Sequence, residues 1–479
     1  MQRVYWIPNS IGTSAAFDTI RLMETDDKTG KTVANGAGAK WLVFLLAVSA
    51  FSATWWLWPQ AQQNQAVVAA TLIAVVILWV SEVIPLFVSA LIGSFLLLAL
   101  GDFSARFVFQ PYFDPVIVLF FGGFILAQGM QKYRIDYRIA HEILKRMGDR
   151  PLVFVLGLML VTAFLSMWMS NTAAAAIMIP ISIIVLKENR LFHEHSRFAR
   201  GVVLAVAYAA TIGGIGSLVG SPPNAIAAKF LGENGISLDF VEWMIKTLPF
   251  VVLALLFTWA LLSFFNRPEI DKIRFTYHER KLDRSQKLIF LIFLVTVIGW
   301  LTTKMTGLSA ATVALLPVIG LFSLGLLDSG DLAKISWPTL LLFGGGLSLG
   351  SAVNEVGIDT LLVGLVQGSI AGIPLFVTLL LLVFIGIAVT MVASNTASAA
   401  ILIPLLLPLA DDLGLDVKSM AMLIAIAVSL DFMMPVGTPP SAIAYSTGMV
   451  NVRQMIMNGF LVNIGTGLIL VLLYYFVYL

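Results

Sequence analysis

The chain has 479 residues, of which 59% are hydrophobic and only 12% are charged, and its mean hydropathy is +0.94. Soluble domains carry about 25% charged residues, so this composition excludes a water-soluble protein and predicts a chain embedded in lipid. A formal net charge of +2 argues against a nucleic acid as partner, and a chain without cysteine forms no disulfide and no iron–sulfur cluster.

Residues 1–40 are mixed and polar, and they lack the short apolar core and small-residue cleavage site of a signal peptide. We therefore expect a cytoplasmic N-terminal arm over 1–40 and a membrane unit over 41–479. Apolar runs of about 17–25 residues are long enough to cross a bilayer. In chain order they lie near 41–58, 65–84, 86–101, 115–131, 201–230, 247–265, 287–305, 309–327, 335–350, 417–447 and 455–478.

Two apolar segments, 151–187 and 374–410, do not fit a single crossing, because each is about twice as long as one hairpin arm and is interrupted by Ser-Asn-Thr. We interpret each as a re-entrant hairpin that enters and leaves on one side. The predicted fold is an all-α polytopic membrane protein with eleven transmembrane helices and two re-entrant hairpins.

The basic residues support this topology. With the N-terminus in the cytoplasm, 24 of the 29 Lys and Arg residues fall in cytoplasmic segments, as the positive-inside rule requires. The remaining five fall on the outer side: Arg106, Lys229, Lys246, Lys304 and Lys418. The C-terminus then lies outside, and we expect the membrane to be a bacterial inner membrane, because the chain shows no targeting signal and no long insertions.

The chain contains an internal repeat. SNTAAAAIMIP at 170–180 matches SNTASAAILIP at 394–404 in nine of eleven positions, and GSPPNAIA at 220–227 corresponds to GTPPSAIA at 437–444. The first repeat covers about 65–265 and the second about 287–479. In the predicted topology the repeats run in opposite directions, which is typical of secondary transporters with a site near the midplane.

The motifs combine two kinds of backbone end. Each double proline, at 222–223 and 439–440, unwinds a helix. Free N–H groups at the start of a half-helix suit a carboxylate, whereas unwound carbonyls and hydroxyls suit a cation such as Na⁺. Ser166 and Ser170 share one helix face, as do Thr390 and Ser394. An alternative is that Ser166 and Thr390 bond back to carbonyls of their own helices.

Neither hairpin carries a charged residue between 151 and 186 or between 374 and 410. A site for a dianion would therefore need co-bound cations to balance its charge, which favours Na⁺ coupling. We expect protons to be the weaker option, because the motif neighbourhoods show no intramembrane acid or histidine to carry them.

These motifs, together with SEVIPL at 81–86, resemble those of the divalent anion/sodium symporter family, which includes sodium-dependent dicarboxylate transporters. The resemblance extends from about residue 41 to the C-terminus. It implies a homodimer that moves a transport domain past a scaffold in an elevator mechanism. It also implies symport of Na⁺ with a C4-dicarboxylate such as succinate, malate or fumarate.

The resemblance further implies which residues bind the cargo. The first Na⁺ site takes Ser166, Ser170, Asn171 and Gly220. The second Na⁺ site takes Thr390, Ala393, Asn395 and Gly437. The substrate shell takes Ser170, Asn171, Thr172, Ser221, Ser394, Asn395, Thr396, Thr438 and Pro439.

Other functions stay open at this point. A sodium-independent dicarboxylate exchanger would use a fixed protein cation, for which Lys229 is the candidate, and the carried anion could instead be citrate or sulfate. A membrane enzyme is disfavoured because all four histidines fall in predicted cytoplasmic loops. His193-Glu194-His195 resembles a pair of metal ligands but lacks a third ligand nearby, so we interpret it as a solvated loop. Glu82 is interpreted as a snorkelling or helix-capping residue.

Overall fold

The structure, a computed structural model, describes residues 32–59, 62–193, 195–275, 282–358, 373–435 and 437–478. Every regular element in these ranges is a helix, which confirms the all-α prediction. The first part of the chain forms α2 (Thr32–Leu57), α3 (Gln63–Ser81), α4 (Leu86–Leu100), α5 (Ala105–Phe109), η2 (Gln110–Phe113), α6 (Pro115–Lys132), α7 (Ile135–Lys145), α8 (Pro151–Ser166), α9 (Asn171–Glu188), α10 (Arg197–Gly214), α11 (Pro222–Glu233) and α12 (Phe240–Phe265).

The second part of the chain begins with α13. It forms α13 (Arg284–Leu301), α14 (Thr303–Thr306), α15 (Ala310–Ser323), α16 (Ser329–Leu332), α17 (Trp337–Glu355), α19 (Leu375–Thr390), α20 (Asn395–Leu406), η3 (Leu407–Leu409), η4 (Asp411–Leu413), α21 (Val417–Ala427), α22 (Pro439–Ser446), α23 (Val452–Leu473) and the terminal π-helical turn η5 (Tyr474–Tyr478).

Within the described ranges, seven helices are long and apolar enough to cross a membrane, and six further apolar helices are shorter. The predicted spans at 201–230 and 417–447 are each divided in two, as α10 with α11 and as α21 with α22, because each double proline starts a new helix. The helix α2 begins at Thr32, inside the segment expected to be the N-terminal arm, while residues 1–31 lie outside the described ranges.

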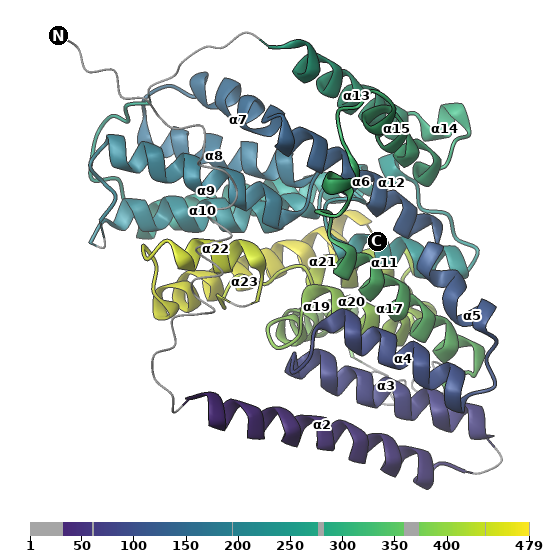
Figure 1. Ribbon diagram of the computed structural model, residues 1–479. Coiled ribbons are helices and arrows are strands. Elements are labelled where there is room, and N and C mark those ends of the chain that lie inside the picture. The colour runs from purple at the N-terminus through teal and green to yellow at the C-terminus, as the bar shows by residue number, and fades with distance from the viewer. Residues whose placement is uncertain are drawn as a thin grey trace.

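The two halves use the same packing pairs. In the first half α10 packs against α8 and α9, and in the second half α21 packs against α19 and α20. The short helices after the proline breaks cross over, because α11 packs against α20 and α21 while α22 packs against α9 and α10. Each hairpin therefore packs against a half-helix from the other half of the chain (Figure 1).

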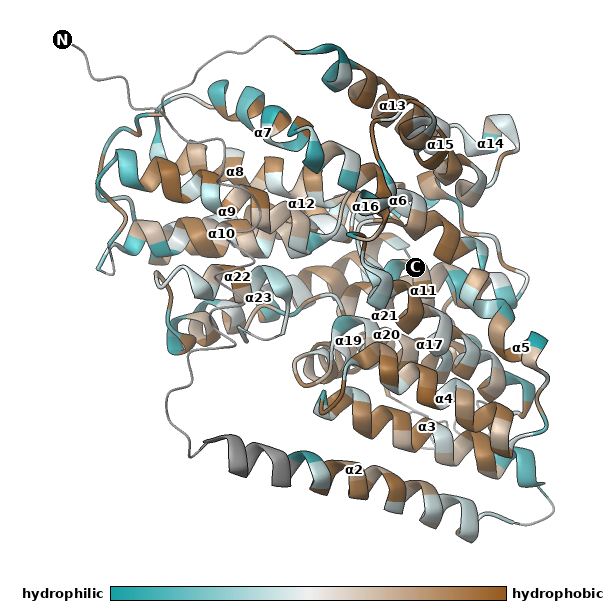
Figure 2. Cartoon of the chain, in the orientation of Figure 1, coloured by the Kyte–Doolittle hydropathy of each residue, from teal (hydrophilic) through white to brown (hydrophobic). Residues whose placement is uncertain are grey.

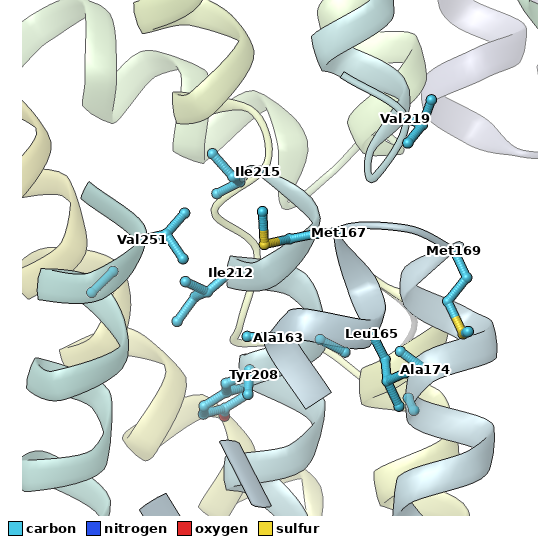
Figure 3. Packing of buried hydrophobic residues seen from close by; sticks show 14 of the residues in the cluster. Ala163, Leu165, Met167, Met169, Ala174, Tyr208, Ile212, Ile215, Val219 and Val251 are labelled. Carbon is cyan, nitrogen blue, oxygen red and sulfur yellow. The ribbon is translucent and has the colours of Figure 1, made fainter. Parts of the chain in front are cut away.

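The helix α10 forms the centre of the apolar core. Its side chains are buried almost continuously from Phe198 to Gly214. It approaches α8 so closely that a Cβ atom at Gly213 would lie 2.3 Å from the Cα atom of Ala163. Figure 3 shows Ala163 and Met167 packed beside Ile212. This close packing fixes the end of α8 against the end of α10.

The periphery of the molecule is apolar where lipid is expected. The helix α2 lies at the edge of the molecule, where it packs against α3 (Figure 1). Its Trp41 and Leu42 are 68% and 69% exposed. Brown, hydrophobic stretches also cover α3, α4 and α15 (Figure 2). The short helix α7 is amphipathic, with Ile135 and Leu144 buried and Glu142 and Lys145 exposed.

Candidate functional site

The first hairpin is made of α8 and α9, joined through residues 167–170. Ser170 caps α9, since its Oγ accepts a hydrogen bond from the backbone N–H of Ala173 at 3.2 Å. The first turn of an α-helix leaves further N–H groups without an intrahelical acceptor and carries a partial positive charge. The first Ser-Asn-Thr motif therefore stands where a helix can receive a carboxylate.

The second hairpin repeats this arrangement. The helices α19 and α20 are joined through residues 391–394, and the Oγ of Ser394 accepts from the backbone N–H of Ala397 at 3.2 Å. Pro180 in α9 and Pro404 in α20 occupy matching places within the second arms. Both motifs thus begin a helix with a serine cap, and each offers the same donor groups.

A cluster of oxygen atoms lies behind the first tip. The Oγ of Ser166 lies 2.6 Å from the carbonyl oxygen of Ala210 and 2.7 Å from the Oδ1 of Asn171. The same amide group of Asn171 lies 3.2 Å from Ala210 O and 3.1 Å from Gly220 O. Ser166 thus reaches across to α10, so the alternative that it bonds back to its own helix is wrong.

This cluster has two ways to be satisfied. With the Asn171 nitrogen turned inward, the amide donates to Ala210 O, Ser166 Oγ and Gly220 O. With its oxygen turned inward, four oxygen atoms converge, and the one hydroxyl proton of Ser166 can serve only one of them, so a positive ion would stabilise the group. Oxygen ligands from side chains and unwound backbone are those that Na⁺ takes in transporters. The groups present therefore fit a Na⁺ ion.

Glycine is required at this cluster for steric reasons. A Cβ atom at Gly220 would lie 2.5 Å from Gly214 O and 2.9 Å from Ser166 O. A Cβ atom at Gly214 would lie 2.1 Å from the Oδ1 of Asn171. The proline break itself is tied down by Asn224, whose Nδ2 donates to Gly214 O at 2.9 Å and to Ser217 O at 2.7 Å.

The second hairpin holds a smaller counterpart. The Oγ1 of Thr390 donates to the Oδ1 of Asn395 at 2.7 Å, so the own-helix alternative is wrong here too. Thr390 and Ala393 are buried, and Asn395 is half-buried. In both halves the hydroxyl at the end of the first arm therefore contacts the asparagine that begins the second arm.

The substrate-shell residues differ in access. Ser170, Asn171, Ser394, Asn395 and Thr396 are half-buried, and Thr172 is exposed. Ser221 and Thr438 precede the prolines and are only 1% and 3% exposed, whereas Pro439 is exposed. Thr438 caps α22 by accepting from the backbone N–H of Ser441 at 3.3 Å. The hydroxyl of Ser170 likewise serves as a cap, and in the described contacts it does not join the oxygen cluster.

One expectation is corrected. The motif neighbourhoods do contain an intramembrane acid, because Asp431 lies in the break between α21 and α22, is 1% exposed and faces Gly437. The charge-free segments 151–186 and 374–410 do not include it, because it belongs to the 417–447 segment. Aligning the two repeats would have found it, since Asp431 precedes Gly437 by the same six residues that separate Gly214 from Gly220.

Lys229 does not serve as a free positive charge. Its Nζ lies 2.9 Å from Asp114 Oδ2 and 3.0 Å from Glu233 Oε1, with 15% of the side chain exposed. The open cavity beside it, about 470 Å³, is lined by Asp114, Glu233 and Glu355 and by no residue of either Ser-Asn-Thr motif. With its only lysine already paired, this cavity is acidic and does not suit a dianion.

Two other sequence interpretations concern charged residues away from the hairpins. Glu82 follows α3 in the left-handed conformation (φ 47°), is exposed, and its N–H bonds to Leu78 O, so it ends the helix. Glu194 lies outside the described residues, and within the described ranges no group of three or more His, Asp or Glu side chains could hold a metal ion.

Comparisons with known proteins assign the membrane unit to a family. Residues 39–478 match the family model described as the sodium:sulfate symporter transmembrane region. The chain is 34% identical over 411 residues to an uncharacterized transporter of Haemophilus influenzae, covering 82% of this chain and 88% of the relative. It is 31% identical over 469 residues to the sodium-dependent dicarboxylate transporter SdcS of Staphylococcus saprophyticus, covering 91% of this chain and 86% of the relative.

Solved structures of transporters share the fold. The YdaH transporter of Alcanivorax borkumensis matches with a TM-score of 0.54 at 14% identity, covering 77% of this chain and 86% of that chain. MtrF of Neisseria gonorrhoeae matches with a TM-score of 0.54 at 11% identity, covering 77% and 82%. The matched family consists of symporters rather than enzymes, in agreement with the expectation that the chain is no enzyme. The chain belongs to the divalent anion:Na⁺ symporter family, as its twin motifs predict.

Proposed function

We propose that the protein is a secondary active transporter that couples the entry of a C4-dicarboxylate, such as succinate, malate or fumarate, to the entry of Na⁺. The observation that carries this proposal is the oxygen cluster of Ser166, Asn171, Ala210 and Gly220 behind the start of α9. A cation in this cluster lies next to a helix N-terminus that attracts a carboxylate, so each ligand strengthens the binding of the other.

The substrate is assigned to the two Ser-Asn-Thr tips. Each tip offers serine and threonine hydroxyls, an asparagine amide and the first N–H groups of a helix, which together bind one carboxylate without a fixed charge. Two such tips match the two ends of a dicarboxylate. The name of the SdcS relative supports this choice of anion, while the description of the family model keeps sulfate as a further candidate.

For the exchanger alternative, the candidate cation is already paired within the described residues. A sodium-independent exchanger needs a fixed protein cation at the dianion, and the candidate Lys229 is held between Asp114 and Glu233. The remainder of the proposal follows the family resemblance: a homodimer in a bacterial inner membrane, with a cytoplasmic N-terminus and a transport domain that moves as an elevator.

Uptake into proteoliposomes tests the proposal. Succinate, malate, fumarate, citrate and sulfate are offered with an inward Na⁺ gradient, with an equal K⁺ gradient, and with internal dicarboxylate but no Na⁺. Symport predicts C4-dicarboxylate accumulation in the first condition alone. Accumulation that depends on internal dicarboxylate and ignores Na⁺ would establish the exchanger instead.

A further inference from the structure

The second cation site differs from the first at one position. In the first half, a Cβ atom at Gly220 would point at the backbone carbonyl oxygens of Gly214 and Ser166, next to the oxygen cluster. In the second half, a Cβ atom at Gly437 would lie 1.9 Å from the Oδ2 of Asp431 and 2.8 Å from its Oδ1. The repeat therefore puts a carboxylate where the first half has a bare backbone.

This carboxylate is buried, and among the described residues it has no hydrogen-bond or ion-pair partner. Asp431 is 1% exposed, and although the backbone amide of Met433 faces it, neither oxygen completes a hydrogen bond within the described part of the chain. Across the described ranges no Lys, Arg or His nitrogen comes within salt-bridge distance of it. An uncompensated charge in such a place is costly, and an intramembrane acid of this kind marks an ion pathway.

Among the described residues, Tyr208 is a neutral neighbour of Asp431. The ring of Tyr208 on α10 lies 5.1 Å from the ring of Phe432, and its buried hydroxyl is also unpartnered in the described part of the chain. A single tyrosine hydroxyl supplies one hydrogen bond. It leaves most of the lone pairs on the two carboxylate oxygens unused, so either a bound cation or a proton must neutralise the carboxylate.

We propose that Asp431 is a direct anionic ligand of the second Na⁺ site, together with Thr390, Asn395 and the backbone at Gly437. This inference rests on the proposed Na⁺ coupling and deepens it. The two sites are then chemically unequal: the first is built from neutral oxygens, and the second contains a full negative charge. A fixed carboxylate attracts Na⁺ without help from a dianion, so the second site fills before the substrate arrives.

Na⁺ binding to the purified full-length protein tests this assignment. The binding of ²²Na⁺ is measured by scintillation proximity without dicarboxylate, and melting temperature is measured in NaCl and in choline chloride of equal ionic strength. The variants are Asp431→Asn, which removes the charge, and Asp431→Gly, which installs the residue of the first half. The controls are Asp416→Asn, at the cap of α21, and Tyr208→Phe, which removes the neighbouring hydroxyl.

We expect the unmodified protein and both controls to bind Na⁺ without substrate. Either Asp431 variant is expected to lose at least tenfold in Na⁺ affinity, equivalent to about 1.4 kcal/mol. NaCl is also expected to raise the melting temperature of either variant less than that of the unmodified protein. In choline chloride, either variant is expected to melt no lower than the unmodified protein, because a buried unpaired charge has been removed.

The results distinguish a failure of the ligand assignment from a failure of the symport proposal. If the unmodified protein takes up dicarboxylate with Na⁺ and an Asp431 variant retains full Na⁺ affinity, the ligand assignment is overturned and the symport proposal stands. If the unmodified protein neither binds Na⁺ nor responds to it in uptake, both are overturned. If Tyr208→Phe weakens Na⁺ binding as strongly as Asp431→Asn does, the carboxylate acts through the tyrosine and is no direct ligand.

Discussion

The carbonyl oxygen of Gly220 lies 3.1 Å from the side-chain amide of Asn171, so the proline break after α10 and the first residue of α9 share one cluster. Residues about fifty positions apart in the chain are thus joined at the place where two helices are interrupted. Because the cluster contains an unwound carbonyl and a hairpin tip, any movement of the tip changes the cation site. In the proposed symporter, this contact would couple the cation to the substrate.

Gly220→Ala is expected to eliminate the first cation site. The added methyl group would lie 2.5 Å from Gly214 O and 2.9 Å from Ser166 O, and such overpacking typically costs about 1–3 kcal/mol. The Na⁺-dependent increase in melting temperature should fall and Na⁺-driven uptake should stop. Gly123→Ala is the matched control, since its methyl group would meet Val219 at an ordinary 3.6 Å. Normal Na⁺ dependence in Gly220→Ala would show that the cation binds elsewhere.

Asn171→Ala and Asn395→Ala are each expected to abolish transport while leaving the protein folded. Asn171 contacts Ser166, and Asn395 contacts Thr390, in both cases through a hydroxyl 2.7 Å away. Removing a group that binds a charged partner costs about 1.5–3 kcal/mol, so uptake at limiting Na⁺ should fall at least tenfold. Size-exclusion profiles serve as the folding control. Unimpaired uptake by either variant would place the site away from the hairpin tips.

Lys229→Met is expected to reduce stability more than it affects substrate binding. The change leaves the carboxylates of Asp114 and Glu233 facing each other without their shared lysine. The double variant Lys229→Met/Glu233→Gln should recover part of the melting temperature, because it removes one of the two stranded charges. Succinate affinity should stay within about twofold in both variants. A large loss of affinity in a stable double variant would instead identify Lys229 as the fixed cation of an exchanger.

Asp331→Asn is expected to lower the melting temperature more at pH 7 than at pH 3. Burial would raise the pKa of Asp331, but hydrogen bonds from Lys132 and Lys334 outweigh it and lower the pKa to about 2. The stabilisation from this carboxylate is therefore present above its unfolded pKa of about 3.9 and is lost as the pH falls toward about 2. Asp328→Asn is the control, because its pair with Lys132 is 3.6 Å long and 70% of its side chain is exposed. Equal losses at both pH values would contradict this ion-pair assignment.

Much of the fold could be predicted because single residues determine where helices begin and where they break. The double prolines predicted the breaks that separate α10 from α11 and α21 from α22. The Ser-Asn-Thr strings predicted two matching helix starts, and Ser170 and Ser394 cap them in the same way. These features depend on local backbone chemistry, so the sequence carries them directly.

The remainder depends on how distant segments pack. The hydroxyl of Ser166 bonds to Ala210 on α10, a contact that spacing along one helix does not reveal. The crossing of α11 and α22 between the halves follows from close helix packing rather than from any motif. Asp431 could not be assigned from the motifs, because its place beside Gly437 appears only when the second break is compared with the first. Motifs gave the parts of the site, whereas tertiary packing decided which parts touch.

In the proposed mechanism, Na⁺ binding at the hairpin tips drives the uptake of a dicarboxylate. Its most direct test is the initial rate of radiolabelled succinate uptake into proteoliposomes, measured with an inward Na⁺ gradient and with an equal gradient of K⁺, for the unmodified protein and for Asn171→Ala. We predict accumulation only with Na⁺ and only in the unmodified protein. Succinate uptake that is the same with Na⁺ and with K⁺ would contradict the coupling of uptake to Na⁺.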